Sequence, residues 1–552
     1  MGFNVNVVQT DSVNKVYSDI PIMGHEVLAH CSMDDSARER VIAWRVNRIL
    51  RPMSWMVDDE ADAEFVETSS FEGAEIYRNT LIFILVIACR KALNREVTVR
   101  YSMSNSYYCE ISGEPATEED VAKVREEMIR IISSSLPIQT AILAQDKARR
   151  IFERQGNKDR ARLIRTTGAD PVMLYRCAGI YGYFGVPLAA TTGKLNTFDL
   201  NWYAPGFLLR FPSITAPNVL PPLQVVPKRM DVFREYTSWL SVLGLTTMDS
   251  LHERVAMGKS LELILISEAF HGEALARIAN HVIDLGTVRL ICVAGPSSSG
   301  KTTTSKRLAT QLQVKGKNPI ALALDDYYVD REMSPRDENG NYDFEAVEAL
   351  DVALINEDIG ALLAGEEVRL PHYDFVTGKR KPGPKLKLRS DDILIIEGLH
   401  GLNEILTKNV PRENKCKLFI SPLTGVSLDS HNRIGTTDIR LLRRVVRDCR
   451  TRGKSPEVTL LMWPSVIKGS QKHIFPYEEG ADMLFNSSLV YEIPVLKGYA
   501  QPLLRAVPED SQAYGEAQRL LSMLQFVPII PSENVPNLSI LREFIGGGCF
   551  ED

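Results

Sequence analysis

The spacing of hydrophobic and polar residues changes several times along the 552-residue chain. Residues 1–68 contain short alternating runs such as NVNVV and EFVE, which predict a small β-rich module. Longer runs with helical spacing follow from Gly73, among them IYRNTLIFILVIACRKAL and a strongly charged stretch from Ala144 to Arg165. From Val288 apolar strands and helices alternate, which predicts an α/β domain with a mainly parallel sheet.

These changes divide the chain into four predicted parts. Residues 1–68 form the β-rich module and residues 69–225 an α+β region. A segment with five prolines, PSITAPNVLPPLQVVPK, ends that region and is typical of a domain linker. Helical patterns continue through a linking region at 226–285, and residues 286–552 form the α/β domain.

Composition narrows the class of protein. The chain is 44% apolar and 24% charged, which excludes a wholly disordered, collagen-like or coiled-coil protein. A net charge of −6 argues against a polybasic coat for nucleic acid or membranes, although local basic patches are still allowed. The longest apolar run, Leu81–Cys89, is too short to cross a membrane and predicts a buried helix. With no secretory leader pattern and eight scattered cysteines, we expect a cytoplasmic protein with reduced thiols.

The strongest chemical signal is a phosphate loop of the form GxxxxGK[ST]. It consists of Gly295, Pro296, Ser297, Ser298, Ser299, Gly300, Lys301 and Thr302. The apolar strand VRLICVA precedes it, and a helix beginning TTTSKR and including Thr303 follows. In this context backbone N–H groups cradle phosphates, Lys301 reaches the β- and γ-phosphates and the Thr302 hydroxyl ligates Mg²⁺. The predicted cofactors are therefore ATP and Mg²⁺.

Two later strands end in carboxylates. Asp325 follows the strand PIALAL, and Glu397 ends the strand DILII. Parallel sheets bind ligands at the carboxyl edge, so Asp325 can deprotonate an attacking hydroxyl while Glu397 holds Mg²⁺ directly or through water. Taken alone, Asp325 could instead lie in a solvated turn after a strand, and strands that end in an acid, like the one before Glu397, are common.

An arginine-rich amphipathic helix is predicted from Asp438. Arg440, Arg443, Arg444 and Arg447 recur at helical spacing, and a loop containing Arg452 follows. Such a helix suits a lid that closes over transferring phosphates. A solvated basic face and a contact with RNA are the alternatives.

In this order and spacing, the four elements resemble the uridine–cytidine kinase branch of the phosphoribulokinase/uridine kinase family over residues 286–500. The likeness extends to DDYY at 325–328, YDFEAVEALD at 342–351, PHYDF at 371–375 and RRVVRD at 443–448. It implies that Asp325 is the catalytic base and Glu397 serves Mg²⁺. It places Tyr328, Phe344, Glu345, Tyr373 and Phe375 at the acceptor, and Arg444, Arg447 and Arg452 against phosphates or acceptor.

The sequence departs from this family at four positions. Glu345 stands where the family has a ribose-holding Asp, and Gly378 stands where it has a His that helps to recognise the pyrimidine. Lys454 replaces an Arg, with loss of planar bidentate geometry, and Met462 replaces a Gln. The resemblance therefore implies intact phosphoryl transfer but altered base recognition.

The N-terminal half has a resemblance of its own. Residues 41–67 are similar to the end of a TGS domain, a β-grasp fold, and LYRCAGIYGYFGVPLAATTG is similar to a loop in the second additional domain of threonyl-tRNA synthetase. Asn79, Phe83, Phe184 and Leu188 stand where that domain has its hydrolytic editing ligands. Aromatic and aliphatic side chains cannot ligate zinc, so we expect the scaffold without the editing site.

The leading hypothesis is an ATP/Mg²⁺-dependent kinase for the 5′-hydroxyl of a nucleoside. Two alternatives stay open: a kinase for another small alcohol, such as a sugar or sugar phosphate, and an RNA-binding regulator with an ATP-driven switch. The charged stretch at 144–165 is the place for an RNA contact, although a solvated helix face explains it as well. A small-molecule acceptor, no membrane and a homo-oligomer are expected as partners.

Overall fold

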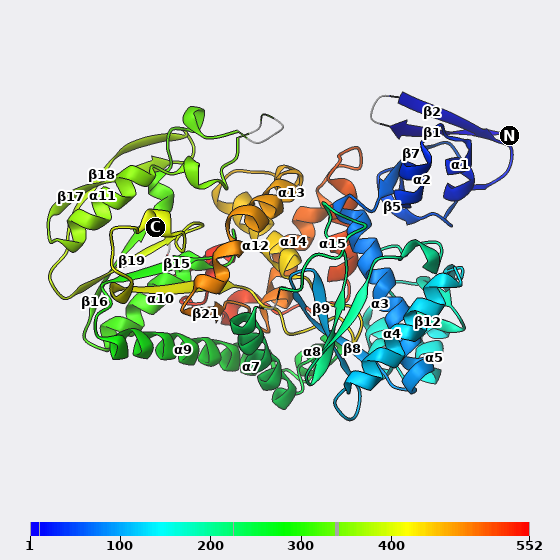
Figure 1. The fold of residues 1–552 in the computed structure, drawn as a ribbon, viewed down its shortest axis with the longest axis horizontal. Helices are drawn as coiled ribbons and strands as arrows, with labels where there is room; N and C mark the ends of the chain where they lie inside the picture. The colour runs from blue at the N-terminus through cyan, green and yellow to red at the C-terminus, as the bar shows by residue number, and fades with distance from the viewer. Residues whose placement is uncertain (1, 10–11, 225, 337–339, 341, 551–552) are drawn as a thin grey trace.

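A computed structural model of the chain describes residues 2–9, 12–224, 226–336, 340 and 342–550. Figure 1 shows the N-terminal strands at one end of the long axis and the C-terminal α/β domain at the other, with residues 71–210 adjoining both. Among the described residues, no helix is long and apolar enough to cross a membrane. The longest apolar run lies in α3 (Phe71–Leu93), where it is buried as predicted.

The N-terminal module is a five-stranded mixed sheet. Its strand order is β2-β1-β7-β4-β5, and only the β1–β7 pair is parallel. The bounds are β1 (Phe3–Gln9), β2 (Ser12–Ser18), β4 (Val41–Val46), β5 (Ile49–Pro52) and β7 (Ala61–Glu67), with α1 (Gly24–His30), α2 (Asp35–Arg40) and the short pair β3 (Ile22–Met23) and β6 (Met56–Val57) between them. Alternate residues of β1, Val5 and Val7, face a core around the buried Trp44. Whether this module is a TGS domain stays a prediction.

The middle region packs helices on two antiparallel sheets, β13-β14-β9-β8 and β10-β11-β12. Its elements are α3, β8 (Val97–Met103), β9 (Ser106–Ile111), α4 (Glu118–Ser133), β10 (Gln139–Leu143), α5 (Gln145–Arg154), α6 (Lys158–Thr166), β11 (Val172–Cys177), β12 (Ile180–Gly182), β13 (Asp199–Tyr203) and β14 (Gly206–Arg210). The charged stretch at 144–165 is thus two helices, because the chain turns between Arg154 and Lys158.

The C-terminal domain contains a five-stranded parallel sheet in the order β16-β19-β15-β20-β21, which confirms the α/β prediction. Its strands are β15 (Leu290–Ala294), β16 (Asn318–Ala323), β19 (Asp392–Gly398), β20 (Lys415–Ser421) and β21 (Met483–Asn486), and a hairpin of β17 (Glu367–Asp374) and β18 (Lys379–Lys387) projects beside it. Successive residues of β15 alternate between two cores: Leu290 and Cys292 join one, Ile291 and Val293 the other. A strand buried on both faces explains the continuous apolar runs of the sequence.

The sheet lies among the helices of residues 227–545, some of which pack on its two faces. These helices are α7 (Pro227–Leu243), α8 (Met248–Ala256), α9 (Ser260–Leu285), α10 (Lys301–Val314), α11 (Val352–Leu363), α12 (Thr436–Thr451), α13 (Pro456–His473), α14 (Glu492–Arg505), α15 (Tyr514–Leu524) and the short α16 (Arg542–Ile545). The region 226–285 contains α7, α8 and α9, which share a hydrophobic core with α10, β15 and β20. The boundary at residue 286 stays a prediction.

A loop of the C-terminal domain is anchored in the middle region. It runs from β20 to α12, and Asp429 within it forms a buried ion pair with Arg160 of α6, 2.7 Å between Oδ1 and Nη2. The Val99 N–H donates to the Ser430 carbonyl at 2.9 Å, and Asn432 donates to the Tyr183 carbonyl at 2.9 Å. The start of α12 is therefore tied to the middle region.

Candidate active site

The phosphate loop connects β15 to α10 as the sequence predicts. Gly300, the last residue before α10, has a φ of +86°, and Ser298 has a φ of +62°. Glycine adopts a positive φ without steric cost, so the chain can turn its N–H groups towards a ligand at the start of α10. The Lys301 ammonium lies 3.5 Å from the Pro296 carbonyl, across the mouth of this loop.

Thr302 and Glu397 meet beside the loop. The Thr302 hydroxyl donates to Glu397 Oε1 at 2.8 Å. Strand register brings them together, because Glu397 in β19 pairs with Val293 of β15, just before the loop. Burial raises the pKa of Glu397 to about 7, an effect that Lys301 opposes and the nearby Asp325 reinforces.

These two oxygens fit a magnesium ion. A hydroxyl and a carboxylate are the hard oxygen ligands that Mg²⁺ prefers, and water completes its coordination in most phosphate sites. Asp325, in the short helix Leu324–Tyr327 after β16, stands at the same edge of the sheet. Ala323 of β16 pairs with Glu397 of β19, and this pairing places Asp325, two residues after Ala323, near Glu397.

The predicted arginine helix, α12, lies against the phosphate loop. Arg440 Nε donates to the Ser297 carbonyl at 2.9 Å, and Arg444 Nη1 donates to the Ser297 hydroxyl at 2.8 Å. Arg443 is fully buried, and its Nη1 lies 3.3 Å from the Ser299 carbonyl. Arginines thus hold the Ser297 and Ser299 carbonyls on one side of the loop, and within the loop the Ser299 N–H donates to the Pro296 carbonyl at 3.1 Å.

The charge of α12 is only partly balanced, although Arg443 forms a fully buried ion pair with Glu492. Asp448 accepts hydrogen bonds from Arg447 at 2.7 Å and lies 3.3 Å from Arg444 and 3.8 Å from Arg452. Arg440 has Trp463 beneath its guanidinium at 5.2 Å, and burial lowers its pKa to about 9, so it stays charged at neutral pH. Excess buried positive charge next to a phosphate loop is suited to a polyphosphate.

Three of the five predicted acceptor residues, Tyr328, Tyr373 and Phe375, form an aromatic group. Ring centroids of Tyr328 and Tyr373 are 5.5 Å apart, and those of Tyr373 and Phe375 are 5.1 Å apart. Tyr328 donates its hydroxyl to the Phe344 carbonyl at 3.1 Å. The exposed Phe375 has the Arg452 guanidinium 5.6 Å from its ring centre.

Two polar side chains near this group have unused hydrogen-bonding atoms. Glu345 Oε2 is shielded from solvent and has no partner among the described residues. Burial raises the pKa of Glu345, although Arg444, Arg440 and Lys301 lower it. His400, three residues after Glu397 in the chain, is 3% exposed and lies beside the Glu345 backbone, which leaves at least one ring nitrogen without a partner in the described chain, and burial lowers its pKa to about 4.

Three of the four positions that depart from the nucleoside kinase pattern have defined contacts. Gly378 lies in the β17–β18 turn with a φ of +70°, and a Cβ there would lie 2.8 Å from the Arg331 guanidinium carbon. Arg331 therefore fills the space next to Gly378. The other two departures touch each other, since Lys454 Nζ lies 3.6 Å from Met462 Sδ.

The middle region has packed its predicted editing position with hydrophobic side chains. Phe83 and Phe184 are buried and make an edge-to-face contact at 5.6 Å, and Leu188 is also buried. The Asn79 amide donates to the Glu75 carbonyl one turn back at 2.9 Å. Within the part of the chain that the structure describes, no group of three His, Cys, Asp or Glu residues is placed to hold a metal ion.

The basic residues of α5 and α6 are partly used inside the protein. Arg160 is buried against Asp429, and Arg162 pairs with Asp249 at 2.6 Å. Both acids belong to segments that pack with the C-terminal domain. These arginines join two parts of the chain, and fewer charges remain for an RNA contact.

Sequence reasoning missed three residues at this site. His400 had a local signal, because it lies three residues after the acid that ends β19. Arg331 has no signal of its own in the sequence, and its place at the site is visible only because its side chain fills the space beside Gly378. Glu543 accepts hydrogen bonds from the Thr303 N–H at 3.2 Å and hydroxyl at 2.8 Å, from 240 positions away, and no local pattern predicts it.

Comparison with known proteins identifies the C-terminal domain. Residues 290–493 match the model of the Phosphoribulokinase / Uridine kinase family. The uridine kinase of Halobacterium salinarum is 27% identical over 196 residues, 35% of this chain and 78% of that protein. The uridine kinase of Chloroflexus aurantiacus is 29% identical over 198 residues, 36% of this chain and 85% of that protein. The chain thus carries a domain of this family, which indicates a phosphotransferase acting on a hydroxyl group.

The N-terminal part has a different relative. The threonine–tRNA ligase of Marinobacter nauticus is 24% identical over 183 residues, which are 33% of this chain and 28% of that protein. The chain therefore matches a little over a quarter of the ligase. Both predicted resemblances are confirmed at this level.

Proposed function

We propose that the chain transfers the γ-phosphoryl group of ATP, with Mg²⁺, to the 5′-hydroxyl of a nucleoside. The observation that carries the proposal is the convergence of Lys301, Thr302, Glu397 and Asp325 at one edge of the parallel sheet. The Thr302–Glu397 hydrogen bond and the electrostatic influence of Lys301 and Asp325 on Glu397 support it.

Each group has a role that follows from its position. The N–H groups of the phosphate loop and the Lys301 ammonium bind the triphosphate. Thr302 and Glu397 would hold Mg²⁺, which when bound neutralises phosphate charge. Asp325 accepts the proton of the acceptor hydroxyl.

The arginines and the aromatic group complete the proposed reaction. Arg444 and Arg447 stabilise negative charge on the phosphoryl group as it moves, because they are charged groups fixed in a poorly solvated site. Tyr328, Phe344, Tyr373 and Phe375 hold the acceptor ring, while the unpaired oxygen of Glu345 can accept from a second acceptor hydroxyl.

The test is a phosphate-transfer screen over nucleosides, sugars and sugar phosphates, with ATP and with GTP. With the best acceptor, Asp325→Asn should lower kcat by about 10²- to 10⁴-fold, the usual contribution of a general base, and leave ATP affinity unchanged. Asp391→Asn removes the same charge from an exposed position before β19 and should leave kcat unchanged. Equal turnover by wild type and Asp325→Asn would refute the assignment of the base.

One observation favours a different small alcohol as acceptor. Arg331 lies against Gly378, where the nucleoside kinases have a base-recognising histidine, and adds a guanidinium beside Phe375. A cation at that position suits a sugar phosphate better than a neutral pyrimidine. Phosphorylation of sugar phosphates in preference to nucleosides would support this second function.

A further inference from the structure

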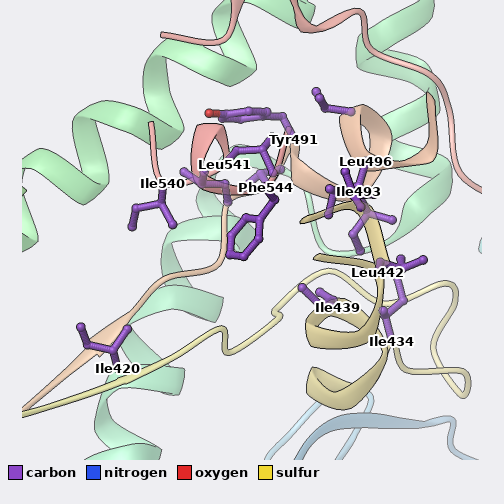
Figure 2. Packing of buried hydrophobic residues seen from close by; sticks show 14 of the residues in the cluster. Ile420, Ile434, Ile439, Leu442, Tyr491, Ile493, Leu496, Ile540, Leu541 and Phe544 are labelled. Carbon is purple, nitrogen blue, oxygen red and sulfur yellow. The ribbon is translucent and has the colours of Figure 1, made fainter. Parts of the chain in front are cut away.

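The C-terminal segment Ser539–Phe550 returns to the phosphate loop. Figure 2 shows Ile540, Leu541 and Phe544 packed beside Tyr491, in the same cluster as Ile439 and Leu442 of α12. These three side chains are buried, and the segment is therefore a fixed part of the domain.

Polar contacts hold the same segment over the arginine helix. Arg450 donates from Nε to the Phe544 carbonyl at 3.2 Å and from Nη2 to the Glu543 carbonyl at 3.1 Å. The Arg443 guanidinium lies 5.0 Å from the centre of the Phe544 ring. Ile540 reaches the loop itself, since a Cβ on Gly300 would lie 2.6 Å from Ile540 Cγ2.

This anchoring places the Glu543 carboxylate at the N-terminus of α10. Its Oε2 accepts from the Thr303 N–H at 3.2 Å and from the Thr303 hydroxyl at 2.8 Å. Thr303 is the third residue of α10, and the first four N–H groups of a helix have no carbonyl of their own helix to bind. In a phosphate-loop protein these N–H groups bind the phosphates of the nucleotide.

We propose that Glu543 is a built-in competitor of the nucleotide: its carboxylate occupies a phosphate position on α10, and a nucleoside triphosphate must displace it to bind. This inference rests on the proposed function, because it takes the loop to be an ATP site. The carboxylate and a phosphate oxygen cannot share the Thr303 N–H, and two anions at one helix terminus repel each other. The buried side chains on either side keep the backbone in place, so the Glu543 side chain alone moves.

Such a competitor weakens every ligand that needs this position by the same factor, so that weakly bound anions are excluded at concentrations where a triphosphate still binds. When an anion binds only at the helix terminus, the Thr303 N–H loses its contact with the Glu543 carboxylate and makes one with the anion, so the net free energy of binding is small. A triphosphate also engages Lys301 and the loop N–H groups, and these further contacts offset the displacement. For every such ligand, the apparent Kd equals the intrinsic Kd divided by the fraction of molecules in which Glu543 does not occupy the site.

The experiment compares the full-length wild type with Glu543→Ala and Glu543→Gln. Titration calorimetry measures the Kd for Mg²⁺ and a non-hydrolysable ATP analogue, and thermal unfolding confirms that each variant is folded. Loss of a charge-assisted contact should tighten binding by about tenfold in Glu543→Ala, with a smaller gain in Glu543→Gln. Glu533→Gln removes an exposed charge of the same chain end and should leave the Kd unchanged.

Lys301→Ala separates the two proposals. Unchanged or weaker binding in both Glu543 variants, with binding still abolished by Lys301→Ala, would overturn the competitor and leave the ATP site standing. If Lys301→Ala leaves nucleotide binding unchanged in the wild type and in both Glu543 variants, the proposed function is refuted, and the competitor role of Glu543 is refuted with it.

Discussion

Removing Arg160 should destabilise the protein far more than removing other basic residues of the same helix. Arg160 and Asp429 are 2% and 1% exposed, and their atoms approach to 2.7 Å. Asp429 also accepts from the N–H groups of His431 and Asn432 and from the Asn432 amide. Without the arginine, these neutral donors are left to stabilise a buried carboxylate.

The magnitude follows from this geometry. Breaking one side of a buried ion pair costs about 3–5 kcal/mol, because the remaining charge stays desolvated, whereas replacing both partners by apolar groups is often neutral. We therefore expect Arg160→Met and Asp429→Leu each to lose about 3–5 kcal/mol, and the double variant to recover most of that loss.

Urea unfolding followed by circular dichroism measures these changes. Arg165→Met is the matched control, because Arg165 is exposed on the same helix, and it should change stability by less than about 0.5 kcal/mol. If Arg160→Met behaves like Arg165→Met, or if the two single losses simply add in the double variant, the ion pair does not couple the two parts of the chain.

Three further outcomes are expected. Below pH 7, where the raised pKa of Glu397 leaves its carboxyl protonated, Mg²⁺ affinity measured by calorimetry should fall about tenfold per pH unit, and Glu397→Gln should abolish that slope. Phe184→Ala should lower stability in urea by about 3–5 kcal/mol by leaving a cavity beside Phe83, and a loss below 1 kcal/mol would show that this core is loosely packed. Gly378→His alone should not increase nucleoside turnover, because Arg331 fills the space and φ is positive, whereas Gly378→His with Arg331→Ala should do so if base recognition depends on that position.

Chemistry that depends on neighbours in sequence could be predicted from the sequence. The phosphate loop is one continuous segment, and Asp325 and Glu397 each end an apolar strand, so strand order alone places them together. The arginine helix was predicted in type but not in environment. Amphipathic spacing predicts a lid or a solvated basic face, yet Arg440 and Arg443 are buried, where they donate to carbonyls of the phosphate loop and Arg443 pairs with Glu492.

Contacts between segments distant in the sequence could not be predicted from the spacing of hydrophobic and polar residues. The charged stretch at 144–165 gave no sign that Arg160 would pair with a residue 269 positions away. Glu543 likewise has only apolar helical spacing around it, which predicts docking on a core but not where its carboxylate lies. Complementary partners of this kind become visible only when the chain is folded.

The packing of Phe83 against Phe184 at the predicted editing position also limits which substitutions the middle region can accept. A histidine introduced at Phe83 or Phe184 would enter a fully apolar contact and leave an imidazole without a partner. Each single step towards a hydrolytic site therefore costs stability before any metal or water can be held. Substitutions that preserve side-chain volume should therefore be tolerated at Phe83 and Phe184 more readily than polar ones.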